Sequence, residues 1–198
     1  MRLLLKFALC LMLALGVGFV VVASRSGDVV YSVYEWVSPA RFQQYDGLIR
    51  TVAAAHELDP MLVKAIVWRE STFDPRKVGS SGERGLMQVS EIAAAEWAKQ
   101  NHIEDFQVED LFDPARNLEA GSWYLQRALK HWKNERDPMP YALAEYNAGA
   151  SRAQRWATDA GAGADGDTFR QTIDFPGTRK YVDSIIARYD FYKRRGRM

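Results

Sequence analysis

Two Asp-Pro pairs, each followed by apolar residues at helical spacing, constrain the fold of this 198-residue chain more than any other feature. In Asp59-Pro60 and Asp113-Pro114, an aspartate that can cap a helix precedes a proline, which favours the first helical position. After both pairs, apolar residues repeat at intervals of three and four, as on one face of a helix. The sequence contains no β-rich half and no internal repeat, so it predicts a single all-α domain.

Other segments carry the same helical signals. Further helices are expected at residues 40–57, from residue 90 or 91 to about residue 100, from Pro140 to near residue 148, and after Thr178. Thr178 is expected to cap the last of them. Gly121, within the helix that follows Asp113-Pro114, would allow a neighbouring element to approach closely. The Gly-, Ala- and Asp-rich residues 158–168 predict a mobile loop.

An uninterrupted apolar run from Phe7 to Ala23 follows the basic residues Arg2 and Lys6. A membrane span needs about 20 apolar residues, with roughly 17 as the lower limit, so this run is just long enough. A secretory signal is the alternative, because Ala23 is a small residue of the kind found at cleavage sites. The apolar core of a cleaved signal is shorter, about 7–15 residues, and the length therefore favours an uncleaved anchor.

These observations divide the chain into three parts. Residues 1–24 are predicted to be a membrane anchor or signal peptide, residues 25–40 a linker, and residues 41–195 the folded domain. Positive charges that precede a membrane span stay in the cytoplasm. The folded domain is therefore expected in the periplasm, held at the inner membrane by its N-terminal segment.

Charge and metal-ligand patterns exclude several classes of partner. The chain has 26 Lys and Arg against 25 Asp and Glu, a balance that does not favour a nucleic acid or another polyanion. Its three histidines, at positions 56, 102 and 131, lack the spacing of metal ligands. No metal and no cofactor are predicted, and the sequence does not identify a protein partner.

Glu70 is the candidate for acid–base chemistry. It lies three and four residues beyond Val67 and Ile66 and so continues their apolar stripe. Partial burial of a carboxyl group raises its pKa and keeps it protonated near neutral pH, as a general acid requires. The alternative is an ordinary solvated glutamate at the C-terminal end of a helix.

Four ordered motifs resemble those of the lytic transglycosylase family, whose catalytic domain has a fold like that of goose-type lysozyme. The motifs are ESTFDP at 70–75, GERGLMQ at 82–88, AEYNAG at 144–149 and TRKYV at 178–182. The resemblance spans about residues 45–192. It implies that residues 41–195 form a lysozyme-like helical catalytic domain that cleaves the glycan strands of peptidoglycan.

The resemblance also implies a mechanism and a set of site residues. Glu70 would protonate the β-1,4 bond between N-acetylmuramic acid and N-acetylglucosamine, and then act as the base that helps form a 1,6-anhydromuramoyl end without water. Gly82 and Gly85 would let the loop backbone approach the sugar. For three of the implied residues another role stays open, namely packing for Met87 and Tyr181 and capping for Asn147. The implied substrate-binding residues are Ser71, Met87, Gln88, Tyr146, Asn147 and Tyr181.

Three positions depart from the family's pattern. Gly79 stands where the family often has serine, and Gly177 where many members carry a glutamate. Glu83 stands where alanine is common, and we expect it to be a surface charge, with a second carboxylate near Glu70 as the alternative. Two other functions remain open: a hydrolytic muramidase with Glu83 as the base, and a weakly active glycan-binding component of cell-wall assembly.

Overall fold

The computed structural model describes residues 6–7, 10–18, 33–35 and 37–196 and divides the chain into two compact units, Met1–Gln43 and Gln44–Met198. In the first unit residues 10–18 are helical, and a short helix, α3, spans Pro39–Gln43. Within the described ranges, no helix combines the length and the apolar character that a membrane span requires. The expected anchor and linker lie partly outside these ranges.

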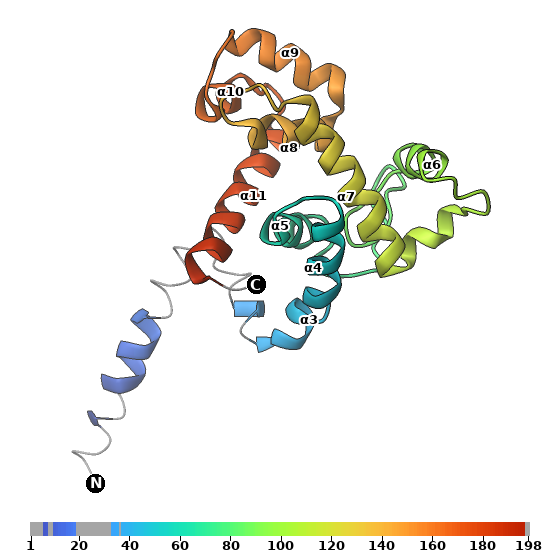
Figure 1. Ribbon diagram of the computed structural model, residues 1–198. Coiled ribbons are helices and arrows are strands. Elements are labelled where there is room, and N and C mark those ends of the chain that lie inside the picture. The colour runs from blue at the N-terminus through green and yellow to red at the C-terminus, as the bar shows by residue number, and fades with distance from the viewer. Residues whose placement is uncertain (1–5, 8–9, 19–32, 36, 197–198) are drawn as a thin grey trace. The chain divides into compact units, whose positions relative to one another are not determined.

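The second unit is built from helices and their connecting loops (Figure 1). In its described part the only β structure is a pair of isolated bridges that join Arg84 to Val78 and to Val89. The expected all-α fold is confirmed. The helices are α4 (Asp46–Ala55), α5 (Pro60–Ser71), α6 (Glu91–Gln100), the 3₁₀ helix η1 (Val108–Phe112), α7 (Pro114–His131), α8 (Pro138–Ala148), α9 (Ala150–Ala160), α10 (Gly166–Thr172) and α11 (Pro176–Arg195).

Helix α5 forms the centre of this unit and packs against α4 and α11 (Figure 1). Its start is as expected, because the Asp59 side chain accepts a hydrogen bond of 2.9 Å from the backbone N–H of Met61. Residues 62–68 are all buried, so α5 is enclosed on every side rather than along one stripe. Glu70, in the last turn, is only partly buried, although Ser71 directly after it is buried again.

Two buried cations join α5 to its neighbours. Lys64 is 1% exposed, and its Nζ lies 2.6 Å from Asp46 Oδ1 on α4. The guanidinium of Arg188 on α11, also 1% exposed, lies 4.3 Å from the ring centroid of Trp68. Charges that are buried in this way need a partner, so these contacts favour one arrangement of α4, α5 and α11 over others.

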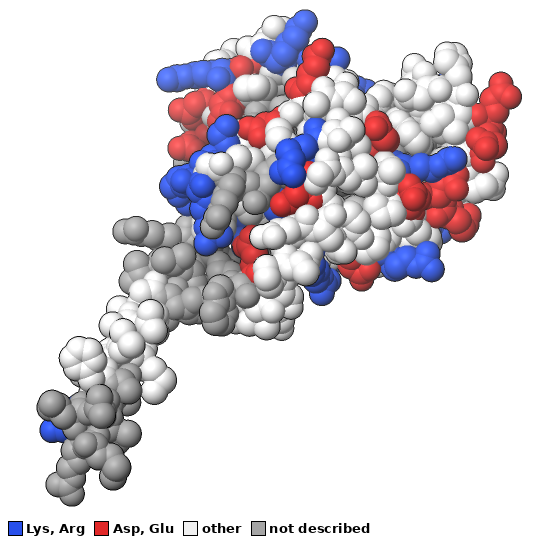
Figure 2. Space-filling model, turned by 60° about the horizontal axis from the view of Figure 1, so that its bottom comes forward, with Lys and Arg blue, Asp and Glu red and all other residues white. Residues whose placement is uncertain are grey.

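Acidic and basic side chains are mixed on the surface. On the face in Figure 2, groups of Lys and Arg lie directly beside groups of Asp and Glu. Elsewhere and on this face alike, oppositely charged side chains pair up: Arg116 lies 2.9 Å from Asp110, and Arg155 lies 2.7 Å from Asp174. This face therefore presents no continuous field of one sign.

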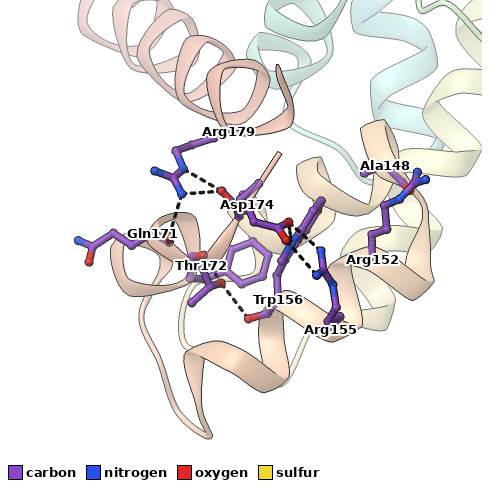
Figure 3. A network of polar contacts seen from close by, with 10 residues as sticks. Ala148, Arg152, Arg155, Trp156, Gln171, Thr172, Asp174 and Arg179 are labelled. Carbon is purple, nitrogen blue, oxygen red and sulfur yellow. Dashed lines mark hydrogen bonds and ion pairs between the residues drawn. The ribbon is translucent and has the colours of Figure 1, made fainter. Parts of the chain in front are cut away.

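A polar network fixes the start of α11 (Figure 3). Asp174, just before the helix, accepts two hydrogen bonds from the guanidinium of Arg155, of 2.9 and 2.7 Å, and one of 2.7 Å from Trp156 Nε1. Arg179, in the first turn, reaches back to the carbonyl oxygens of Ile173 and Gln171. The segment between α10 and α11 is thus held to α9 on one side and to α11 on the other, which sets the direction in which α11 enters the core.

Most of the expected helix boundaries agree with the structure, with three differences. The helix expected to start at Pro140 already begins at Pro138. The helix expected over residues 40–57 is interrupted at residues 44 and 45, which form a turn between α3 and α4. Thr178 is not the cap of α11, because the helix already begins at Pro176. Its hydroxyl instead donates a hydrogen bond of 2.8 Å to Oδ1 of Asn147 on α8.

The prediction of a mobile loop at residues 158–168 was wrong for most of that segment. Residues 158–160 complete α9 and residues 166–168 begin α10, so that only residues 161–165 connect them. Both helices are anchored by a fully buried aromatic side chain, Trp156 on α9 and Phe169 on α10. Burial of these rings outweighs the weak helix propensity of the Gly- and Asp-rich residues around them.

Candidate active site

A cleft of about 290 Å³ opens at the C-terminal end of α5. Side chains from α5, α6, α7, α8 and the loop between α5 and α6 form its walls. Glu70 and Glu83 are the charged residues among those that line it. The lining residues are Glu70, Glu83, Gln88, Val89, Ser90, Ala93, Tyr124, Tyr146, Asn147 and Gly149.

The environment of Glu70 favours the protonated carboxyl group. Burial raises its pKa from 4.5 to about 7, an effect that outweighs the hydrogen bond from Tyr181 and the positive charges of Arg69 and Lys77. The negative charge of Glu83 adds a smaller contribution in the raising direction. The hydroxyl of Tyr181 donates to Glu70 Oε1 at 2.7 Å. Glu70 is thus held in one orientation with a pKa suited to proton transfer near neutral pH.

The backbone on both sides of the cleft adopts uncommon conformations. Directly after α5, Thr72 and Phe73 have φ angles of 57° and 61°, and Gln88 has a φ of 47°. Positive φ is rare for residues other than glycine, and such residues concentrate at functional sites. Thr72 and Phe73 directly follow Ser71, the last residue of α5, and their left-handed conformation turns the chain sharply. Glu70 therefore lies at the open end of the helix.

Asn117 holds the loop between α5 and α6 in place, and the motif comparison did not single it out. It is fully buried on α7, and its Oδ1 accepts from the backbone N–H of Met87 at 2.7 Å. Its Nδ2 donates to the carbonyl oxygens of Arg84 at 2.8 Å and Leu111 at 2.9 Å. One side chain therefore joins the loop to α7 and η1. The only indication in the sequence is its place on the helix expected after Asp113-Pro114.

Two glycines serve packing at this junction. A Cβ on Gly85, whose φ is +77°, would come within 2.3 Å of both Asn117 Nδ2 and the Leu111 carbonyl oxygen. The close approach that Gly85 permits within the structure is thus to Asn117 and Leu111. A Cβ on Gly121 would lie 2.6 Å from Met87 Sδ. The neighbouring element expected to approach Gly121 closely is therefore the loop between α5 and α6, which contacts it through Met87.

Three of the six residues implied by the resemblance line the cleft with Glu70. Gln88 Nε2 donates to the carbonyl oxygens of Lys77 and Gly85, both at 3.0 Å, which leaves its own side-chain oxygen as the group that can accept from a ligand. The hydroxyl of Tyr146 donates to the Met87 carbonyl oxygen at 3.0 Å, and burial raises its pKa well above the usual value. Asn147 is exposed at the rim and accepts from Thr178.

The other three residues lie behind the cleft wall. Met87 is fully buried against Gly121, so its side chain packs, which is the alternative stated for it above. Ser71 is 2% exposed, and its hydroxyl donates to the carbonyl oxygen of Val67 at 3.2 Å. Tyr181 is 3% exposed and reaches the cleft only through its hydroxyl group, at Glu70.

Glu83 is not the surface charge that we expected. It is partly buried and lines the same cleft as Glu70. Its Oε2 accepts a hydrogen bond of 3.1 Å from the backbone N–H of Ser81. The alternative stated for it, a second carboxylate near Glu70, is the one that agrees with the structure.

The sequence of the folded unit matches a known family model. Residues 47–169 match the family described as the transglycosylase SLT domain. The chain belongs to this family. The match includes Glu70, Gln88 and Tyr146, and its boundaries fall within the unit Gln44–Met198.

Relatives in this family are named for one activity. The soluble lytic murein transglycosylase of Escherichia coli K12 is 30% identical over 151 residues, which are 76% of this chain and 23% of that protein. The membrane-bound lytic murein transglycosylase F of Desulfosudis oleivorans is 32% identical over 55% of this chain and 23% of its own length. A solved 70-kDa soluble lytic transglycosylase in complex with bulgecin A superposes with a TM-score of 0.74 at 25% identity, over 85% of this chain and 28% of that one.

The chain spans about a quarter of the length of these curated relatives. The segment shared with the solved transglycosylase includes most of the helices described above, and this likeness supports the lysozyme-like architecture expected from the sequence.

Proposed function

We propose that this protein is a lytic transglycosylase that cleaves the glycan strands of peptidoglycan. The observation that carries the proposal is the carboxyl group of Glu70, which lines a cleft, accepts a hydrogen bond from Tyr181 and has a pKa of about 7. Membership of the transglycosylase SLT domain family, and relatives named lytic murein transglycosylases, support the same activity.

In the proposed reaction Glu70 acts twice. Its protonated carboxyl group gives its proton to the glycosidic oxygen between N-acetylmuramic acid and N-acetylglucosamine, and the bond from that oxygen to C1 of the muramic acid breaks. The 2-acetamido oxygen of the substrate stabilises the developing positive charge, as in other substrate-assisted glycosidases. The Glu70 carboxylate then takes the proton of the C6 hydroxyl, whose oxygen bonds to C1. The product is a 1,6-anhydromuramoyl end, and Glu70 is protonated again.

The remaining site residues would bind and orient the strand. The side-chain oxygen of Gln88 can accept from an acetamido N–H, because its own amide group is held by two backbone carbonyls. The ring of Tyr146 lies in the cleft at 71° to that of Tyr124, with centroids 5.5 Å apart, and the two form an aromatic wall. Asn147 offers amide groups at the rim. Ser71 and Tyr181, which lie behind the wall, would act by holding α5 and Glu70.

A hydrolytic muramidase is the second candidate, because Glu83 places another carboxylate in the cleft. Many glycosidases that use water employ two carboxyl groups, one as the acid and one as the base or nucleophile. In this alternative Glu83 would activate a water molecule and the product would carry a reducing end. The bond that is cleaved would be the same, so only the chemistry of the new end separates the two candidates.

The first prediction tests Glu70. Replacing Glu70 with Gln removes the proton donor but keeps the shape of the side chain, so glycan binding should remain while turnover falls by about 10²–10⁴-fold or more. Turnover is measured on purified peptidoglycan, with Glu104→Gln in an exposed loop as the matched control. A Glu70→Gln protein within a few-fold of wild type would contradict the mechanism.

The products of the wild-type reaction decide between the two candidates. Mass spectrometry of the released fragments should find 1,6-anhydro ends, which are lighter than reducing ends by one water. Reducing ends instead, together with loss of activity in Glu83→Gln as large as in Glu70→Gln, would establish the hydrolase. An inactive wild-type chain in a zymogram would leave the glycan-binding component as the remaining function.

The proposed location follows from the substrate and the N-terminal segment. Peptidoglycan lies outside the inner membrane, and the apolar run from Phe7 to Ala23 is just long enough to span it. We therefore place the domain in the periplasm, anchored by residues 1–24 or released if they are a cleaved signal. Among the relatives, one is named a soluble and another a membrane-bound lytic murein transglycosylase.

A further inference from the structure

Glu83 occupies space that exists because residue 79 has no side chain. A Cβ built on Gly79 would lie 2.3 Å from Glu83 Oε2 and 2.9 Å from Gln88 Oε1, and both distances are too short for real atoms. The backbone N–H of Gly79 donates to the Glu83 carbonyl oxygen at 2.7 Å, so the two residues are also joined through the main chain. Gly79 and Glu83, two of the departures from the family pattern, thus form one structural unit.

The carboxylate of Glu83 is held in position but its charge is not neutralised. The N–H of Ser81 fixes Oε2. Among the described residues, no Lys, Arg or His forms an ion pair with Glu83, and none lines the cleft. Burial raises the pKa of Glu70 to about 7 and so favours its neutral form. Arg69 and Lys77 also act on Glu70, but neither lines the cleft, so Glu83 is the charged residue that lines it beside Glu70.

A neutral sugar does not need such a charge. Gln88 and Asn147 already supply amide oxygens that accept hydrogen bonds from hydroxyl and amide groups. A carboxylate beside the acid adds like-charge repulsion whenever Glu70 loses its proton. A cation is the ligand group that an unpaired carboxylate binds better than an amide oxygen does. In a glycan strand, this cation would be a protonated amine.

We infer that Glu83, seated against Gly79, makes this cleft selective for strands that carry a free, protonated amine. The amine can belong to an amino sugar without its N-acetyl group or to the peptide attached to the strand. The inference rests on the proposed function in taking the cleft as a glycan site, and it concerns which strands are bound rather than which bond is broken. Glu83 is then a specificity-determining residue.

The experiment compares pairs of ligands that differ only in the amine. The full chain carrying Glu70→Gln is titrated in mildly acidic buffer with N-acetylglucosamine tetramer and with glucosamine tetramer. A second pair is a disaccharide peptide with a free side-chain amine and the same compound with that amine acetylated. Adding Glu83→Gln should weaken binding of an amine ligand by about fivefold and leave its acetylated partner within about twofold. The amine preference should also decrease as salt is added.

Two further variants control for fold and for net charge. Gly79→Ser adds a side chain where the Glu83 carboxylate lies and should remove the preference although Glu83 is still present. Asp105→Asn removes one exposed negative charge from the loop after α6 and should change nothing. Melting temperatures of all variants show that each protein is folded.

The outcomes separate the inference from the proposed function. An effect in one ligand pair alone identifies the source of the amine, sugar or peptide. Equal losses for amine and acetylated ligands in Glu83→Gln, or no loss for either, overturn the inference. If the Glu70→Gln protein binds none of the four ligands and the wild-type chain cleaves no peptidoglycan, the proposed function itself fails.

Discussion

The proton on Glu70 links this residue to the pH dependence of the whole reaction. Its pKa is raised from 4.5 to about 7 by burial, so the carboxyl group is protonated below pH 7 and ionised above it. A general acid must carry its proton, and kcat/KM should therefore fall about tenfold for each pH unit above 7. The opposite sign, activity that rises through pH 7, would mean that Glu70 serves as the initial base.

Tyr181 influences the pH at which kcat/KM begins to fall. Its hydroxyl donates to Glu70 Oε1 at 2.7 Å and lowers the pKa of Glu70, because the hydrogen bond stabilises the ionised form. In Tyr181→Phe the pKa of Glu70 should rise, and the falling limb of kcat/KM should move to higher pH by about one unit. The measurement is the pH profile on soluble glycan.

The matched control is Tyr189→Phe, which removes the same hydroxyl group from the same helix. Tyr189 donates to Asp59 Oδ2 at 2.9 Å, at the start of α5, and Asp59 does not line the cleft. Its pH profile should match wild type. A Tyr181→Phe profile that is lower everywhere but not displaced would show that Tyr181 acts only through packing.

At the scale of elements, the loop between α5 and α6 depends on α7 for its shape. Three hydrogen bonds of the buried Asn117 satisfy the N–H of Met87 and the carbonyl oxygens of Arg84 and Leu111. In Asn117→Leu the Met87 N–H and the Leu111 carbonyl would be buried without partners, whereas the Arg84 carbonyl keeps its hydrogen bond of 3.0 Å from the Val89 N–H. At about 1–3 kcal/mol for each of the two groups, the free energy of unfolding should fall by roughly 2–6 kcal/mol. Urea denaturation measures this loss.

The same variant tests whether the loop positions the site. The side chain of Gln88 depends on the Gly85 carbonyl within this loop, and Tyr146 depends on the Met87 carbonyl. Activity of Asn117→Leu, assayed well below its melting temperature, should therefore fall further than the unfolded fraction explains. Asn134→Leu, on an exposed turn after α7, is the control for the substitution itself. Activity equal to wild type per folded molecule would contradict this role for the loop.

At the scale of the whole molecule, the two units have separate tasks in the proposed function. The unit Gln44–Met198 contains the cleft, and the N-terminal segment would hold it near its substrate. Full-length protein expressed in a Gram-negative host should appear in the inner-membrane fraction, with its active domain accessible from the periplasm. The unit Gln44–Met198 behind an unrelated cleavable signal should be active in the soluble periplasmic fraction.

N-terminal sequencing of the mature full-length protein completes this test. A soluble protein that begins near Ser24 would show that residues 1–24 are a cleaved signal, and only the anchor would be lost from the proposal. A linker of residues 25–40 reaches at most about 3.3–3.6 Å per residue. An anchored enzyme would therefore act close to the membrane surface.

Local patterns in the sequence were enough to predict the elements that short-range chemistry specifies. Asp59-Pro60 and Asp113-Pro114 mark the starts of α5 and α7. In each pair the aspartate accepts a hydrogen bond from a free backbone N–H of the first turn and the proline suits the first helical position, so no distant contact is needed. The partial burial of Glu70 also followed from its place on an apolar stripe, and its raised pKa agrees with that expectation. These features depend on neighbours three or four residues away, which sequence spacing records.

Features that depend on residues far apart in the chain could be seen only once the helices were packed together. Residues 166–168 join helix α10 because Phe169 finds a core to enter, whereas the Gly-, Ala- and Asp-rich residues 158–168 favour a loop by composition. Glu83 faces the cleft because the loop folds back on itself over Gly79, whereas the sequence led us to expect a surface charge. Tyr181 meets Glu70 across 111 positions of sequence. Such contacts arise from the packing of whole helices, and no local pattern encodes them.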